Sequence, residues 1–137
     1  MRPITILAFM AIATIVISCK GKEESTQMNH VMAVHDEVMP KMGQLGKLVA
    51  ELKAMENDST EIGKQYKTAR IELQEANEAM MDWMQNFGNR FTPDEILNGA
   101  ELSEQKKQWL NEEEVKTKAL RNQINASIEN AKNLLDK

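Results

Sequence analysis

The sequence predicts an all-α protein, an elongated antiparallel three-helix bundle with coiled-coil character that follows a cleaved signal peptide. Beyond residue 18 the composition is dominated by Glu, Lys, Gln, Ala, Leu and Met, which are strong helix formers. Apolar residues recur there at alternating spacings of three and four, the pattern of an amphipathic helix. No alternating run of β-branched residues, which would indicate a strand, occurs in this part of the sequence.

The first 18 residues have the organisation of a secretory signal peptide. Arg2 precedes an apolar run, and the small residue Ser18 stands before Cys19, the only cysteine of the chain. The apolar run is shorter than the about 20 residues that a transmembrane helix needs. The sequence VISC at 16–19 resembles the lipobox of bacterial lipoproteins, which lose the preceding peptide and carry lipid on the cysteine. We therefore predict lipid attachment at Cys19; the alternative is an uncleaved N-terminal anchor.

Residues 19–26 form a short charged segment, which predicts a flexible tether between the lipidated cysteine and a helical domain over 27–137. The lysine and the acids of this segment resemble the export signal of bacteroidete-type lipoproteins. The expected location is therefore the cell envelope, with the chain anchored by lipid to the outer membrane, on its periplasmic face or at the cell surface.

The first helix is predicted over residues 27–56. Pro40 lies inside this helix, lacks a backbone N–H and crowds the preceding turn, so we expect a kink there. The kink either lets a long helix follow the bundle or presents His35 and its acidic neighbours to a ligand. Apolar residues at helical spacing, with His35 among them, mark the face that should be buried: Met28, Val31, Met32, His35, Val38, Met39, Met42, Leu45, Leu48 and Leu52.

The second helix is predicted over residues 60–87. We expect Asp58 or Ser59 to cap its start and Gly88 to end it, because glycine tolerates the left-handed conformation of a C-cap. Its apolar seam alternates spacings of four and three without interruption: Ile62, Tyr66, Ala69, Leu73, Ala76, Met80, Trp83 and Phe87.

A short helix over 93–98 and a long last helix over 103–135 complete the prediction. Thr92 and Glu95 form a capping box around Pro93 at the start of the short helix. The last helix is rich in Glu and Lys in its middle, so we expect that stretch to be weakly packed or exposed. The short connections favour a chain folded back on itself, and the alternative is a longer coiled coil of identical copies.

The first helix also carries a cluster of methionine and histidine. Thioether and imidazole groups are soft ligands that suit copper, above all Cu(I). Antiparallel pairing would bring the start of the first helix near the end of the second, so Met32, His35 and Met39 could combine with Met80 as metal ligands. The alternative is that these methionines only fill gaps in the core.

Charge and motifs argue against several other functions. Loss of Arg2 with the signal leaves 16 basic residues against 21 acidic ones, so nucleic acid is not an expected partner. No Glu-x-x-His pair, P-loop or Gly-x-Ser-x-Gly motif is present, and both histidines lie on one predicted helix, so we expect no enzymatic activity. The tripeptide at 58–60 resembles a bacteroidete-type acceptor for O-glycosylation, which makes Ser59 a candidate modification site.

Three segments resemble a group of small bacteroidete lipoproteins that often carry the label "viral A-type inclusion protein". These segments are HDEVMPKM at 35–42, MMDWM at 80–84 and WLNEEEV at 109–115. The resemblance implies helices and an envelope location, and it implies no activity.

The expected function is therefore that of a non-enzymatic, lipid-anchored envelope protein that acts as a helical interaction or structural module. Its expected partners are the membrane, through Cys19, and an unidentified envelope protein or a second copy of the chain. The alternative function is a carrier of copper or of a small ligand.

Overall fold

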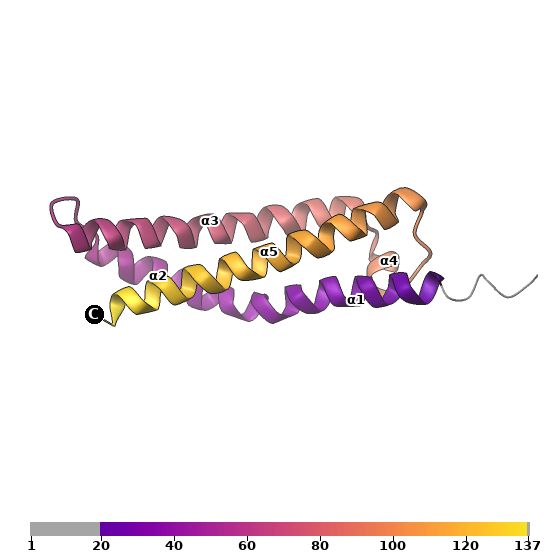
Figure 1. Ribbon diagram of the computed structural model, residues 1–137, viewed down its shortest axis with the longest axis horizontal. Helices are drawn as coiled ribbons and strands as arrows, with labels where there is room; N and C mark the ends of the chain where they lie inside the picture. The colour runs from indigo at the N-terminus through magenta and orange to yellow at the C-terminus, as the bar shows by residue number, and fades with distance from the viewer. Residues whose placement is uncertain (1–19, 137) are drawn as a thin grey trace, which may run out of the picture.

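The computed structural model describes residues 20–136, so the predicted signal peptide and Cys19 lie outside the described residues. Within this range the chain is all-α and its three main helical rods pack antiparallel to their neighbours in sequence, which confirms the predicted fold class (Figure 1). The elements in order are α1 (Lys20–Val38), the 3₁₀ turn η1 (Met39–Lys41), α2 (Met42–Met55), α3 (Glu61–Arg90), α4 (Pro93–Leu97) and α5 (Glu104–Leu135).

The helix α5 packs against both other rods. Together, α1, η1 and α2 form the first rod, α3 returns along it, and α5 runs back beside both. The contacts of α5 are mainly with α3 and α1, whereas α2 packs mainly on α3. The start of α1, the short α4 and the start of α5 therefore share one end of the bundle, and the α2–α3 turn lies at the other (Figure 1).

One continuous apolar core runs the length of the bundle, and its members recur at the spacing of three and four that keeps a seam facing its neighbours. The second-helix seam is confirmed from Tyr66 to Phe87, but Ile62 is exposed and Gly63 takes its place. The largest fully buried side chains are Phe91, Leu52, Leu73, Met80, Leu110, Ile124, Glu113, Val31 and Val38.

The expected kink at Pro40 takes the form of a single 3₁₀ turn. Proline occupies an early position of η1 and has no N–H to donate to the Asp36 carbonyl of the preceding helical turn. The backbone N–H of Met42 donates to the Met39 carbonyl. Val38 keeps right-handed helical dihedrals of φ −96° and ψ −24°. The helix therefore tightens locally at Pro40, and Val38 and Leu45 on either side of the turn are both buried.

The predicted tether at 19–26 is wrong from Lys20 onward, because these residues belong to α1. Within this segment Glu24 contacts the bundle, because Lys107 Nζ of α5 lies 3.0 Å from Glu24 Oε1. The hydroxyl of Thr26 donates to the carbonyl oxygen of Lys22 at 2.8 Å. The charged composition predicted a flexible tether, but it could not show that α5 would pack beside Glu24.

The boundaries of the second helix also differ from those expected. Thr60, rather than Asp58 or Ser59, caps α3 by accepting a hydrogen bond from the Gly63 amide. The helix continues through Gly88 to Arg90, because Phe91 is buried directly beyond it and Arg90 forms ion pairs with α5. The predicted capping box of Thr92 and Glu95 at α4 is confirmed.

Two glycines of α3 provide a matched test of packing against the α2–α3 turn. A Cβ at Gly63 would lie 2.3 Å from the Asn57 carbonyl oxygen, whereas a Cβ at Gly88 would meet nothing within 4 Å. We expect Gly63→Ala to lower the free energy of unfolding by about 2 kcal/mol, because the backbone of the turn must move. Gly88→Ala should raise it by about 0.5 kcal/mol through helix propensity.

Urea denaturation followed by circular dichroism measures both changes. Equal effects of the two substitutions would contradict the close approach of Gly63 to the turn.

Candidate functional site

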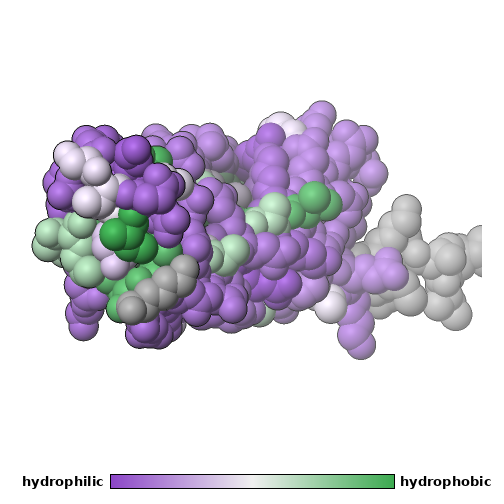
Figure 2. Space-filling model, turned by 60° about the vertical axis from the view of Figure 1, so that its left-hand side comes forward, coloured by the Kyte–Doolittle hydropathy of each residue, from purple (hydrophilic) through white to green (hydrophobic). Residues whose placement is uncertain are grey.

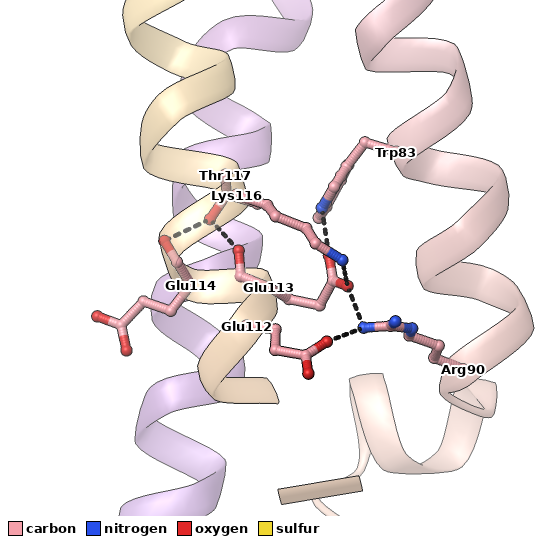
Figure 3. Close-up of polar contacts among 7 residues, drawn as sticks. All are labelled: Trp83, Arg90, Glu112, Glu113, Glu114, Lys116 and Thr117. Carbon is pink, nitrogen blue, oxygen red and sulfur yellow. Dashed lines mark hydrogen bonds and ion pairs between the residues drawn. The ribbon is translucent and has the colours of Figure 1, made fainter. Parts of the chain in front are cut away.

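The most distinctive polar group of the bundle is the carboxylate of Glu113, which lies in the middle of α5. Its side chain is only 1% exposed. It accepts hydrogen bonds from Trp83 Nε1 at 2.8 Å, from an Arg90 guanidinium nitrogen at 2.8 Å and from Lys116 Nζ at 3.1 Å (Figure 3). A buried carboxylate needs such donors, since an unpaired charge is strongly destabilising in the interior.

This stretch of α5 was expected to be weakly packed or exposed, and that expectation is wrong. Leu110, Glu113, Thr117 and Leu120 continue the seam at spacings of three, four and three, and all four are buried. Val115, the apolar residue of the stretch, is 69% exposed. The uninterrupted spacing from Leu110 to Leu120 was the sequence signal for this register, but polar residues occupy two of its positions.

Aromatic rings extend the Glu113 network toward the α4 end of the bundle. Trp83, Phe87 and Phe91 stack in a row, with ring centroids 4.9 and 4.8 Å apart. The Arg90 guanidinium lies 5.2 Å from the ring centroid of Trp109 and also donates to Glu112 at 2.8 Å. The aromatic row and the ion pairs together tie the end of α3 to α5.

A groove of about 330 Å³ opens beside this network, between α3 and α5. Its lining combines apolar side chains, among them Ala79, Ala119 and Leu120, with the charged side chains of Glu113 and Lys116. Such a lining suits a small amphipathic molecule better than a strongly charged one. The sequence instead placed a small-ligand site at the Pro40 kink.

The four predicted metal ligands lie on two helices. His35 is 17% exposed at its side chain, and Met32 and Met39 pack at the edge of the core on the same helical rod. Met80 of α3 is fully buried. The His35 ring centroid lies 5.6 Å from that of Trp83, so the expected approach of the first helix to the second is real at this point, although α1 packs mainly on α5.

The remaining candidate residues lie elsewhere. Ser59 is exposed in the α2–α3 turn, where its amide bonds to the Asn57 side chain. Cys19 lies outside the described residues. Within 20–136, no group of three or more His, Cys, Asp or Glu side chains is placed to hold a metal ion.

A second polar junction joins α5 to α1 at Glu114. Hydrogen bonds from Lys118 and from Gln27, together with the nearby imidazole of His30, lower the pKa of this carboxyl from 4.5 to about 2, against the opposing effect of partial burial. The contacts to Gln27 and His30 cross between helices, so the ionised form of Glu114 stabilises the packing of α1 on α5.

Comparison with known proteins returned no matching family model, no matching curated protein and no matching solved structure. The resemblance to small bacteroidete lipoproteins therefore stays a prediction. Among the described helices, none combines the length and the apolar character that crossing a bilayer demands.

Glu112 and Glu113 offer a neighbouring pair for testing the buried network, because both bond to Arg90 but only Glu113 is buried. We expect Glu113→Ala to lower the free energy of unfolding by about 3 kcal/mol, since Trp83 Nε1 and Arg90 lose a buried acceptor. Glu112→Ala should cost no more than about 0.5 kcal/mol, as for other exposed ion pairs. Chemical denaturation of both variants measures the difference, and equal losses would show that burial of Glu113 is unimportant.

Stability should fall as the pH drops from about 4.5 to about 2, because the folded-state pKa of Glu114 lies below its unfolded value. Protonation of Glu114 through this pH window removes its contribution to the free energy of unfolding. That contribution is about 1 kcal/mol for a partly solvated group and is fully present above pH 4.5. Glu114→Gln should flatten this part of the stability profile in urea denaturation. An NMR titration that placed the Glu114 carboxyl at its ordinary pKa would refute the explanation.

Proposed function

We propose that this protein is a lipid-anchored helical module of the bacterial envelope, without enzymatic activity, that presents an interaction surface away from the membrane. The observation that carries the proposal is the lipobox-like sequence at 16–19, followed at the very next residue by the start of α1. A lipid on Cys19 would then hold the bundle by the end that contains the start of α1, α4 and the start of α5.

This attachment leaves the α2–α3 turn as the end farthest from the anchor. The 30-residue α3 spans about 45 Å at 1.5 Å per residue, so the far end stands well beyond the lipid headgroups if the bundle is upright. We call this far end the distal tip and define it by Met55, the turn at 57–60, and Ile62.

The distal tip combines exposed apolar and charged groups. Met55 and Ile62, which flank the turn, are 45% and 39% exposed. Figure 2 brings this end forward and shows hydrophobic surface gathered on it, while the sides of the bundle are largely hydrophilic. Lys67 and Asp58 form an ion pair at 2.8 Å beside it. An apolar patch with a charged rim is the composition of a protein-binding surface, which supports an envelope protein or a second copy as the partner.

The anchor is tested by replacing the only thiol of the chain. We expect Cys19→Ser to abolish labelling by a radioactive fatty acid, to leave the signal peptide uncleaved and so to keep the unprocessed chain out of the outer-membrane fraction, because the residue that would carry the anchoring acyl chains is missing. Mass spectrometry of the mature N-terminus and membrane fractionation measure these changes. Unaltered processing in Cys19→Ser would defeat the proposal.

The distal tip is tested by photo-cross-linking in cells that produce the chain with Cys19 intact. A cross-linker at Met55 should yield a discrete adduct, whereas a cross-linker at Met81, which is similarly exposed on the side of α3, should not. An adduct of twice the mass of the chain would identify a second copy as the partner. Equal labelling from both positions would show that the tip has no special role.

A further inference from the structure

Residues able to act as soft metal ligands recur on α1, η1 and α3 around the ring contact of His35 with Trp83, and we call this region the α1–α3 seam. The side of α1 that faces α5 is identified by Gln27, which bonds to Asn111 at 2.8 Å, and by His30, which lies 3.3 Å from Glu114. Met32, His35 and Met39 share a different stripe of the rod, because residues three, four and seven apart lie above one another. The ring contact of His35 with Trp83 shows that this stripe approaches α3 at His35, although α1 packs mainly on α5.

On α3, Trp83 lies between the face that packs on α5 and the face that approaches α1. Trp83 donates to Glu113 of α5, and Ala79 lines the α3–α5 groove with it. Met80 and Met84 lie about 60° and 100° from Trp83 around the helix, on the side away from Ala79, as 3.6 residues per turn requires. Both thioethers therefore belong to the face of α3 that meets α1. Met80 is fully buried, whereas Met84 is partly buried and packs at the edge of the core.

His35 is already oriented as a metal ligand would be. Its Nδ1 lies 2.9 Å from Asp36 Oδ1. Within the described part of the chain its Nε2 has no hydrogen-bond partner. A carboxylate on one ring nitrogen holds the ring in place and raises the basicity of the other, which is the arrangement found behind metal-bound histidines. The His35 side chain is 17% exposed, so the ring is not sealed in the core.

We propose that His35 Nε2 and the thioethers of Met32, Met39 and Met84 bind one Cu(I) ion in the α1–α3 seam, with the face of Trp83 as a neighbouring cation–π surface. Thioether and imidazole ligands select Cu(I) over the harder divalent cations, and an indole ring attracts a nearby cation. Met84 replaces the Met80 expected from sequence, because Met80 is committed to the closed core. The site lies within the described bundle and does not depend on the lipid anchor.

The proposal is tested by anaerobic titration of the full chain, purified in detergent, with Cu(I) in the presence of a chromophoric competing chelator. All proteins carry Cys19→Ser, because a free thiolate would itself bind Cu(I). We expect one ion per chain with sub-micromolar affinity and quenching of tryptophan fluorescence on binding. His35→Gln and Met84→Leu should each weaken binding tenfold or more, while leucine keeps the volume of methionine and so preserves the fold.

The matched controls are His30→Gln and Met81→Leu, which alter the other histidine and an exposed methionine outside the seam. Neither should change the affinity. Circular dichroism confirms that each variant is folded. Failure of the parent chain to compete with the chelator, or an equal loss in the seam variants and the controls, would overturn the site.

Discussion

The buried carboxylate of Glu113 sets the relation between the two longest helices. Apolar contacts are non-directional and roughly proportional to area, so two regular seams can slide past each other by a turn at modest cost. A carboxylate that is 1% exposed cannot slide in this way, because it needs the indole N–H of Trp83 and the guanidinium of Arg90 at hydrogen-bond distance. The register and the rotation of α3 against α5 follow from that requirement.

Other features of the bundle depend on this register. It turns Trp83 so that its ring lies between α5 and α1, where it contacts His35 on one side and borders the α3–α5 groove on the other. It also brings Arg90 over Trp109 and aligns the row that ends at Phe91, which extends α3 beyond Gly88. One polar residue in a core position thereby determines where the aromatic surfaces of the bundle lie.

The first rod is held in a different manner on its two sides. Toward α5 it uses polar contacts, including Lys41 to Asn125 at 2.7 Å and Arg121 to Glu37 at 3.6 Å. Toward α3, α1 and η1 instead carry Met32, His35 and Met39. Thioethers are flexible and polarizable, so this side can adapt to an inserted ion or to a shift of the rod at the Pro40 turn. The methionine-bearing side of the first rod and the side that makes polar contacts with α5 are thus separate surfaces.

Much of the helical layout was predictable, and the failures have specific causes. The α3 seam and the capping box of α4 were recognisable because each depends on local spacing and local hydrogen bonds. The burial of Glu113 was missed because hydropathy assigns a carboxylate to solvent unless its donors are known. The helical start at Lys20 was missed for a similar reason, since the partner of Glu24 lies on α5, far along the chain.

The candidate sites likewise have features that local sequence patterns predict and features that depend on contacts between distant segments. Local patterns along the chain were enough to define the helical class, the approximate extent of each long helix and the set of residues able to act as soft ligands, because periodicity and residue chemistry are local properties. Which side chains meet could be seen only in the folded bundle: His35 with Trp83, Glu113 with Arg90, and Gln27 with Glu114. The physical reason is that the rotation of each helix about its axis results from packing and buried hydrogen bonds between distant segments, which no local pattern records.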